Sequence, residues 1–353
     1  MDCYNRQVRV AAILHPYDSD ACLDGFRRPA IDIFRGTEIE RGDLPDAGIV
    51  FGGDGSVHRI LGSLAETACP LLVVPTGSGN DFARAIGIST VQHALAAWET
   101  FLQDRDRALR VLDLGLLEDS SAPASRDREN PDRVAAAPPT WTFADREGRI
   151  PPPAQKIDTA IMQTQLRHLT EAEVAARKTY FCCIAGIGLD AEANAFANSM
   201  SRFFRRHGGY SWAALRALMH HRPQPVTATL DDGTRFSGPS LLCAFGNAHS
   251  YGGGLRMLPR AQLDDGLLDV CFVDAVSKLK VLWEFHTIYS GNHLALDIVH
   301  YSRTRALTVE TDSAMPIYAD GEFVGTTPVR ARIVPKALTV IVPPYGKRPT
   351  GNG

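Results

Sequence analysis

The sequence has no apolar run long enough to cross a membrane and no surplus of positive charge. No segment reaches the roughly 18 consecutive apolar residues that a spanning helix needs, and the first apolar run is too short for a signal peptide. The formal net charge of −3 and the pI near 6.4 lack the basic footprint of bulk nucleic-acid binding. We therefore expect a cytoplasmic protein that binds no nucleic acid.

The sequence also lacks the cysteine patterns of zinc sites and disulfide frameworks. Its seven cysteines are scattered, Cys182 and Cys183 are adjacent, and no CxxC or Cys/His ligand spacing occurs. Such usage is typical of free thiols in a reducing compartment. We expect these cysteines to be buried and unpaired.

Two nucleotide-binding motifs are missing, although glycine is concentrated at two points. Residues 51–60, "FGGDGSVHRI", follow the apolar run "AGIVF", and residues 75–88, "PTGSGNDFARAIGI", follow "PLLVVP". Neither is a Walker A loop or a Rossmann GxGxxG. A loop without Cβ atoms at a strand end can wrap its N–H groups around an anion, and the following helix adds its positive end. The alternative is an ordinary tight turn, because Gly-Asp-Gly is common in turns.

A carboxylate lies inside the first of these loops. A loop that only binds phosphate gains nothing from the negative charge of Asp54. The carboxylate is explained if Mg²⁺ bridges it to the phosphates or if it receives a proton during transfer. In the second loop, Asn80 or Asp81 is positioned to cap the helix "FARAIGI". Side by side at the carboxyl ends of parallel strands, the two loops would form a crevice that fits a nucleotide.

The 353 residues predict about two domains. Residues 1–112 alternate short Val/Ile/Leu runs with helical patterns, which is typical of an α/β domain with a parallel sheet. Residues 113–345 contain mostly strand patterns separated by Gly, Asp and Pro turns, with helical interruptions near 196–220 and 277–297. The second domain is therefore predicted to be β-rich, and residues 346–353 form a tail.

An insertion interrupts the second domain at about residues 118–156. It is rich in Pro, Ser and charges of both signs, and its few large apolar residues cannot offset the entropy of ordering. We expect it to be mostly disordered. A short helix, "LTEAEVAARK", is predicted to follow, with Thr170 as its N-cap and Glu173 at the reciprocal capping position.

Five motifs in order make the chain recognisable. "GGDGS", "PTGSGNDFARAIG", "AGIGLDA", "GGGLRMLPRAQLDDGLLDV" and "YADGEFVGTTPVRARIVPKALTVIVP" together resemble the diacylglycerol kinase catalytic-domain family. The resemblance implies a nucleotide-binding α/β domain like that of NAD kinases and phosphofructokinases, joined to a β-sandwich-like lipid domain. It also implies an enzyme that uses ATP and Mg²⁺ to phosphorylate a lipid alcohol in the cleft between the domains.

The resemblance assigns roles to individual residues. Glu322 of "DGE", with Asp320 beside it, is the candidate general base for the lipid hydroxyl, and Asp54 belongs to the Mg²⁺–ATP network or acts as the base. A carboxylate within reach of the acceptor proton is what phosphoryl transfer needs. The implied nucleotide-binding residues are Gly52, Gly53, Asp54, Gly55, Ser56, Val57 and His58 in the first loop, Gly77, Ser78, Gly79, Asn80 and Asp81 in the second, and Thr37 after the second strand.

Two metal assignments follow from the same resemblance. "PRAQLDDGLLDV" resembles a structural Mg²⁺ loop whose ligands would be the side chain of Asp265 and the main-chain carbonyls of Gln262 and Leu267. Asp113 resembles an aspartate of the catalytic metal network. The alternatives are a hairpin turn for the loop, because Asp-Gly is itself a strong turn signal, and local hydrogen bonding for Asp113.

The chain departs from the family pattern near its N-terminus. "LHPYDSD" stands in place of the common "NPxSG" stretch, too few residues separate the second and third strand runs for the usual helix, and Arg59 reverses a charge. Three hypotheses therefore stay open: an ATP:lipid kinase acting on diacylglycerol or a related alcohol, an NAD kinase-like phosphotransferase, or a binding protein that has lost turnover.

Membrane contact is predicted for the segment 198–223. It carries arginines, histidines and aromatic residues and no acidic residue, which suits the headgroup region of anionic lipids. We assign peripheral contact to the "SRFFRRH" half, which contains Arg205 and Arg206, and interpret "WAALRALM" as a core helix with a solvated basic face. A homodimer is a further possibility.

Overall fold

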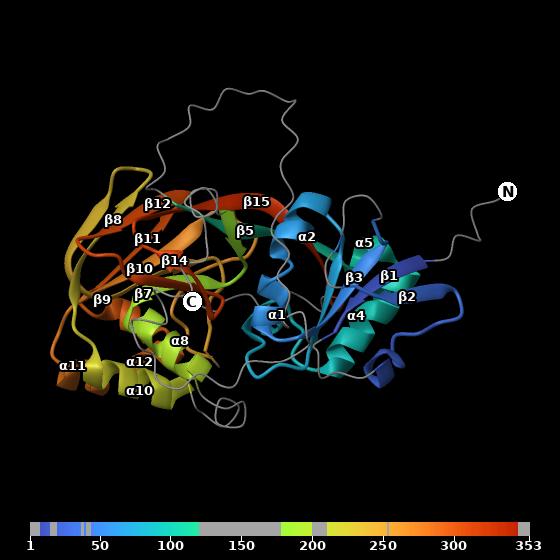
Figure 1. Cartoon of the computed structure of the whole chain (residues 1–353), viewed down its shortest axis with the longest axis horizontal. Coiled ribbons are helices and arrows are strands. Elements are labelled where there is room, and N and C mark those ends of the chain that lie inside the picture. Colours follow the sequence, from blue (N-terminus) through green and yellow to red (C-terminus); the bar gives the residue numbers. More distant parts are fainter. Residues whose placement is uncertain are drawn as a thin grey trace, which may run out of the picture.

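The protein folds into two lobes (Figure 1). The structure, a computed structural model, describes residues 8–14, 20–36, 39, 44–119, 178–199, 210–252 and 254–344. One lobe contains the strands β1 to β4 and the helices α1 to α5, and the other contains most of the remaining strands. The predicted α/β and β-rich fold classes are both confirmed.

The first lobe is built on a parallel sheet in the order β4-β3-β1-β2. All six residues of β3 are buried, as expected for a parallel strand covered on both faces. The strands are β1 (Val8–Ile13), β2 (Ile31–Arg35), β3 (Ala47–Gly52) and β4 (Leu71–Pro75). The helices are η1 (Asp20–Leu23), α1 (Asp54–His58), α2 (Leu61–Thr67), α3 (Asp81–Ala85), α4 (Val91–Gln103) and α5 (Arg105–Ala108).

The helix α4 shows how this lobe closes. Thr90 begins it, with a side chain that accepts the N–H of His93. Its buried face carries Trp98, whose Nε1 donates to the carbonyl of Phe26 at 3.0 Å. The apolar periodicity that predicted this helix therefore marks the face that packs on the sheet.

The second lobe is mostly antiparallel, in the order β14-β13-β7-β9-β8-β12-β15, with β10 on β9, β11 on β10 and β6 on β5. Its strands are β5 (Leu109–Asp119), β6 (Lys178–Phe181), β7 (Ile184–Gly188), β8 (Gln224–Leu230), β9 (Arg235–Gly246), β10 (Leu268–Asp274), β11 (Val299–Thr304), β12 (Ala306–Thr311), β13 (Pro316–Ala319), β14 (Glu322–Thr326) and β15 (Val329–Ile341). The run "MPIYADGEF" is thus a hairpin of two strands, because its Asp-Gly pair forms the turn.

Helices occupy both predicted interruptions of this lobe. They are α8 (Leu189–Ser199), α10 (Tyr210–His220), α11 (Lys278–Glu284), α12 (Thr287–Ser290) and η3 (Asn292–Ala295). In Figure 1, α8, α10, α11 and α12 lie together along the lower edge of the lobe. The chain offers no helix that is both long and apolar enough to cross a membrane, within the part that the structure describes.

Two long strands join the lobes into one sheet. β5 and β15 are antiparallel partners along most of their length, and Val340 near the end of β15 also pairs in parallel with Leu71 of β4. The ladder of β15 is interrupted between Val334 and Leu338, where Lys336 has a φ of +56°. The second lobe is therefore tied to the first through backbone pairing and not only through side chains.

Asp113 holds this junction together. It is buried, and its carboxylate accepts the N–H of Lys336 at 2.8 Å and that of Gly266 at 2.7 Å. Its main-chain N–H donates to the carbonyl of Leu263, and its carbonyl accepts from the side chain of Asn247. One carboxylate thus fixes the interruption of β15 and the loop that was predicted to bind a structural metal.

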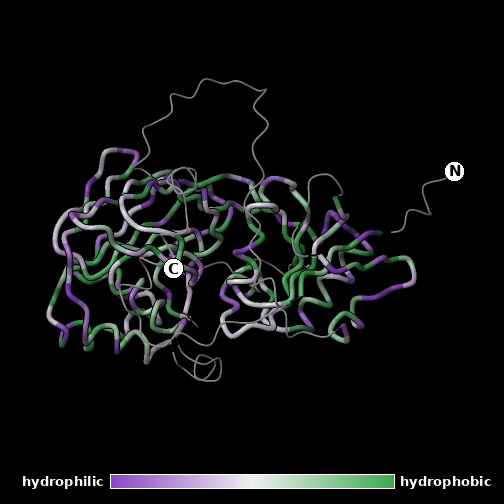
Figure 2. The backbone as a smooth tube through the Cα atoms, in the orientation of Figure 1, coloured by the Kyte–Doolittle hydropathy of each residue, from purple (hydrophilic) through white to green (hydrophobic). Residues whose placement is uncertain are grey.

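Apolar side chains form two buried clusters. One fills the first lobe and continues beneath the helices of the second, while the other lies among β7 to β10, β12, β13 and β15. In Figure 2, green for hydrophobic residues is dense on the central strands of the first lobe. The five buried cysteines of the described residues are free thiols, as is the partly buried Cys22, as expected.

Some sequence predictions fall outside the described residues. Nearly all of the insertion and the helix predicted at Thr170 lie there, while Glu118 and Asp119, placed at the start of the insertion, end the strand β5. The segment 200–209, with Arg205 and Arg206, is also outside the described part.

Asp113→Ala should lower the free energy of unfolding by about 2–4 kcal/mol, because two buried N–H groups lose their acceptor. Urea unfolding of wild type and variant measures this difference. Asp312→Ala, which removes an exposed carboxylate, is the matched control and should change stability by less than about 0.5 kcal/mol. Equal stability of the two variants would contradict the role of Asp113.

Candidate active site

The two glycine loops touch one another. β3 and β4 are parallel neighbours with Gly52 opposite Pro75, and the N–H of Thr76 donates to the carbonyl of Gly52 at 3.1 Å. A Cβ atom on Gly77 would lie 2.5 Å from the backbone of Gly53. The expected adjacency of the loops is therefore confirmed, and these two glycines are needed for backbone contact as well as for any ligand.

Asp54 binds the second loop. Its carboxylate accepts the N–H groups of Asn80 and Asp81 at 3.0 Å and that of Phe82 at 2.9 Å. The prediction that Asn80 or Asp81 caps α3 is wrong, because Asn80 occupies the cap position with a φ of +86° and no side-chain cap hydrogen bond. Asp54 supplies the cap from 26 residues earlier in the chain.

Negative charge accumulates around Asp54. Burial and the neighbouring charge of Asp81 raise the pKa of Asp54 to about 6, against the lowering effect of the N–H donors, and Asp320 also raises it. Asp81 is itself buried and accepts from Arg84 at 2.5 Å. Crowded carboxylates of this kind are the donor set that a divalent cation stabilises.

Unused backbone donors line both loops. The N–H groups of Gly53, Gly55, Ser78 and Gly79 donate to no residue that the structure describes, and Ser78 is exposed. Such donors suit phosphate oxygens. In contrast, the N–H groups at the start of α3 already donate to the carboxylate of Asp54, so the positive end of this helix faces a protein side chain and not a ligand. Ser56 and Val57 are buried against the sheet, and Thr37 lies outside the described residues.

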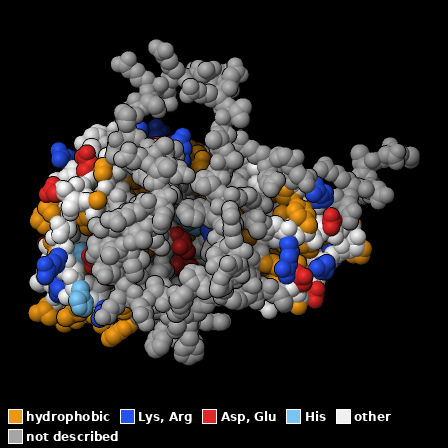
Figure 3. Space-filling view, viewed as in Figure 1, with side chains coloured by type: hydrophobic (Ala, Val, Ile, Leu, Met, Phe, Trp, Pro, Cys, Tyr) orange, Lys and Arg blue, Asp and Glu red, His pale blue; other side chains and the backbone are white. Residues whose placement is uncertain are grey.

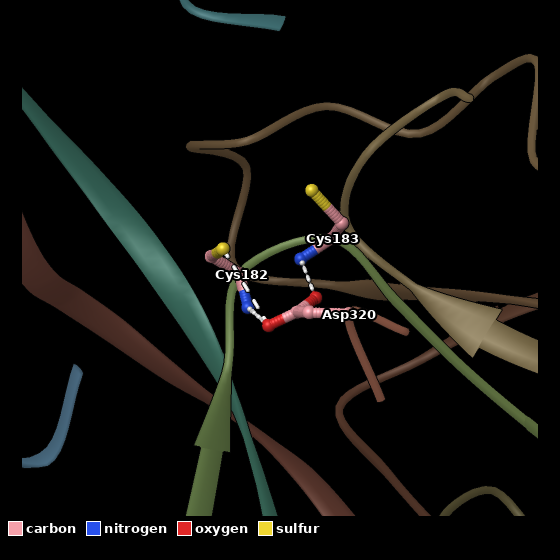
Figure 4. A group of neighbouring side chains, drawn as sticks. All are labelled: Cys182, Cys183 and Asp320. Carbon is pink, nitrogen blue, oxygen red and sulfur yellow. Dashed lines mark hydrogen bonds between the residues drawn. The ribbon is translucent and has the colours of Figure 1, made fainter. Parts of the chain in front are cut away.

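The "DGE" turn reaches this site from the second lobe. Asp320 and Gly321 have φ values of +52° and +85° and form the two-residue turn between β13 and β14. The carboxylate of Asp320 accepts the N–H of Cys182 at 2.9 Å and that of Cys183 at 2.8 Å (Figure 4). It also lies 3.0 Å from Nδ1 of His58, so it connects α1 of the first lobe to the second lobe.

Glu322 lies against the first glycine loop. A Cβ atom on Gly55 would overlap the carboxylate oxygen Oε1 of Glu322, whose side chain is otherwise exposed. Burial lowers the pKa of Arg59 and the charge of Glu322 partly restores it, and burial and Glu322 raise the pKa of Tyr318. The structure therefore places the carboxylate of Glu322 against Gly55, the residue that follows Asp54 in the chain.

The group Cys182, Cys183 and Asp320 has the spacing of a metal site, but hydrogen bonds already occupy its carboxylate. Within the described ranges, this is the group of three Cys, His, Asp or Glu side chains whose ligand atoms lie close enough together to hold a metal ion. Burial, a hydrogen bond with Cys183 and the charge of Asp320 raise the pKa of the Cys182 thiol well above its usual range. Because the carboxylate of Asp320 already accepts two N–H groups and faces His58, we assign this group to holding the "DGE" turn.

The loop predicted to hold a structural Mg²⁺ is ordered by protein contacts. The carboxylate of Asp265 accepts the N–H of Leu267 at 3.1 Å and pairs with Arg303, and Gln262 is exposed. Asp113 accepts the N–H of Gly266 in the same loop. The structure thus brings Asp113 and Asp265 to one loop, and a cation there would have to replace Arg303 as the partner of Asp265.

Sequence reasoning missed an apolar cavity of about 110 Å³ in the second lobe. It is lined by side chains of α8, β9, α11 and α12, among them Leu189, Leu242 and Phe285. One buried carboxylate, Asp190, also lines it and accepts the hydroxyl of Tyr251 at 2.5 Å. The signal was present in "AGIGLDA", where an aspartate opens a helix directly after a strand.

The helix α8 connects this cavity to the "DGE" turn. Its first turns, with Leu189 and Ala193, line the cavity, and near its end the side chain of Asn198 donates to the carbonyl of Gly321 at 2.7 Å. Figure 3 shows acidic side chains near the middle of this face of the molecule. An apolar cavity and a cluster of carboxylates and free N–H groups therefore lie at opposite ends of one helix.

Comparison with known proteins gives two family matches. Residues 30–114 match the "Diacylglycerol kinase catalytic domain", and residues 183–342 match the "YegS C-terminal NAD kinase beta sandwich-like domain". A protein named "Diacylglycerol kinase" from Mycobacterium tuberculosis is 32% identical over 302 residues, which cover 85% of this chain and 78% of that protein. A "Probable lipid kinase YegS-like" from Shewanella frigidimarina is 24% identical over 301 residues, covering 84% and 76%.

A solved structure described as a diacylglycerol kinase from Bacillus anthracis shares the fold. It superposes with a TM-score of 0.57 at 17% identity and covers 96% of this chain and 97% of its own. The family matches, the 32% identity of the Mycobacterium tuberculosis relative and the order of the motifs lead to one assignment. The chain belongs to the diacylglycerol kinase catalytic-domain family.

Proposed function

We propose that this protein transfers the γ-phosphate of ATP to the hydroxyl group of diacylglycerol or a related lipid alcohol, with Mg²⁺ as cofactor. The observation that carries the proposal is the position of Glu322 against Gly55, between the two glycine loops and the helix that lines the apolar cavity. In this proposal residues 1–112 bind the nucleotide and residues 113–345 bind the lipid.

The glycine loops are proposed to bind the triphosphate. The free N–H groups of Gly53, Gly55, Ser78 and Gly79 provide several donors without any charge of their own. Mg²⁺ would neutralise charge on the phosphates, held near Asp54 and Asp81, where burial first and the charge of Asp81 second raise the pKa of Asp54. Asp54 therefore has two tasks in this proposal, joining the loops and facing the cation.

Glu322 is proposed to be the general base. It accepts the proton of the lipid hydroxyl while the hydroxyl oxygen bonds to the γ-phosphorus and the bond to the bridging oxygen of ADP breaks. Asp320 does not take this proton, because its carboxylate is committed to two N–H groups and His58. Asp320 positions the turn that carries Glu322.

The apolar cavity is proposed to receive the hydrocarbon part of the acceptor. Its walls suit an acyl chain, and Asp190 with Tyr251 forms a polar point on them. An NAD kinase-like acceptor would need polar walls instead, so the cavity favours a lipid. We also propose that Asp265, Gln262 and Leu267 hold a structural cation, with Asp113 fixing their loop.

Glu322→Gln should lower kcat roughly 10²–10⁴-fold, because the acceptor loses its base while the glycine loops stay intact. The measurement is transfer of label from [γ-³²P]ATP to a panel of diacylglycerol, ceramide, sphingosine and NAD, resolved by thin-layer chromatography. Wild type should yield a labelled phospholipid. Affinity for a non-hydrolysable ATP analogue should be unchanged in the variant.

Glu310→Gln is the matched control, because Glu310 is an exposed glutamate on β12. It should retain the wild-type rate. If labelled NAD phosphate were the only product, the acceptor would be NAD and not a lipid. If no labelled product formed at all, the result would favour a binding protein without turnover. A wild-type rate in Glu322→Gln would remove the proposed base.

Asp54→Asn should change how stability depends on pH. Because the folded state raises the pKa of Asp54 from 3.8 to about 6, the folded state binds the proton more tightly, and wild type should lose stability as pH rises from about 4 to 6. A shift of this size corresponds to about 3 kcal/mol at most. Urea unfolding across this range should show a flatter profile for the variant, and parallel profiles would refute the buried charge.

A further inference from the structure

Two helices of the second lobe expose large apolar side chains. On α10, Trp212 is 59% exposed and Met219 is 60% exposed, and on α11, Leu279 is 80% exposed and Trp283 is 78% exposed. Leu215 and Leu282 lie between them on the same faces. We call these six residues, Trp212, Leu215, Met219, Leu279, Leu282 and Trp283, the α10–α11 patch.

The members of the patch belong to one surface. Their spacing of three, four and seven residues places them on one face of each helix. The end of α10 meets the start of α11, where Nζ of Lys278 donates to the carbonyl of Met219 at 2.5 Å. Figure 1 shows the two helices beside each other along the lower edge of the lobe, where Figure 3 shows hydrophobic side chains beside basic ones.

The opposite faces of the same helices are buried or line the apolar cavity. Ala213 and Leu218 of α10 are buried, and the apolar cavity is lined by Ala214 of α10, Val281 of α11 and Phe285, which directly follows α11. The core-helix interpretation of "WAALRALM" is therefore correct for one face only. Its outer face carries Trp212 and Met219, which a solvated basic face does not explain.

The surroundings of the patch are cationic. Residues 210–222 and 277–291 contain four Lys and Arg residues and three His residues but one acid, Glu284, which lines the cavity. Arg216 and Lys278 are exposed next to the apolar side chains. Exposed tryptophan and leucine side chains beside such cations match the interfacial region of a bilayer with anionic headgroups.

We propose that the α10–α11 patch docks on the surface of a membrane that contains anionic phospholipid, and that the apolar acceptor enters the cavity between these helices. This proposal rests on the proposed lipid kinase function. The patch inserts into the headgroup region while the inner faces of α10 and α11 continue the apolar path into the protein. A membrane, unlike a folded protein partner, is both the occupant of the patch and the source of the lipid for the cavity.

The test is sedimentation with vesicles of equal parts phosphatidylcholine and phosphatidylglycerol. The double variant Leu279→Gln, Trp283→Gln should bind at least about tenfold more weakly than wild type, because two exposed side chains no longer leave water. Leu44→Gln with Val111→Gln, which changes exposed apolar residues elsewhere, should bind as wild type does. Circular dichroism melting establishes that both variants are folded.

Kinase activity separates this proposal from the proposed function. With a short-chain diacylglycerol dissolved as monomers, the double variant should keep the wild-type rate, and with diacylglycerol in the vesicles its rate should fall with its binding. If the double variant bound vesicles more weakly but wild type showed no kinase activity, the result would support docking and overturn the proposed lipid kinase function. Vesicle binding by the double variant that equals that of wild type would overturn docking. Docking would also be overturned if wild type bound no vesicles but formed a dimer in gel filtration that the double variant converted to a monomer.

Discussion

The carboxylate of Asp54 holds the two glycine loops of the first lobe together. It accepts three consecutive N–H groups at the start of α3, and through them it holds the second glycine loop against the first. Gly77 permits this contact, because its backbone leaves no room for a Cβ atom, and a Cβ atom on Gly53 would lie only 3.3 Å from Gly77. The N–H groups of Gly53, Gly55, Ser78 and Gly79, which donate to no residue that the structure describes, lie along these loops, and for this reason we propose the joined loops as one phosphate site.

The second lobe completes this site through a small number of buried polar contacts. β15 continues the sheet of the first lobe, and Asp113 fixes the interruption that lets the strand serve both lobes. Asp320 then holds the "DGE" turn beside His58, so that Glu322 lies over Gly55. The helix α8 extends from this turn to the apolar cavity. The glycine loops, the proposed base Glu322 and the apolar cavity are thereby placed in one arrangement by backbone geometry.

Much of this arrangement could be predicted from local patterns. Apolar runs indicated β3 and β4, and because consecutive parallel strands end at one edge, the adjacency of their loops followed. Long-range choices could not be predicted: spacing does not show that Asp54 caps a helix 26 residues away or that Asp190 faces a cavity. The spacing of apolar residues predicted a helix at α10, but it could not show that the outer face stays exposed, because exposure depends on which surfaces the rest of the chain covers.

The most direct test of the joined loops is the affinity for Mg²⁺ and a non-hydrolysable ATP analogue, measured by calorimetry. Gly77→Ala places a Cβ atom 2.5 Å from the backbone of Gly53 and must separate the loops. It should weaken binding about tenfold or more, equal to about 1.4 kcal/mol. Gly62→Ala on α2 meets open space and should bind as wild type does. Equal affinity of both variants would contradict the account.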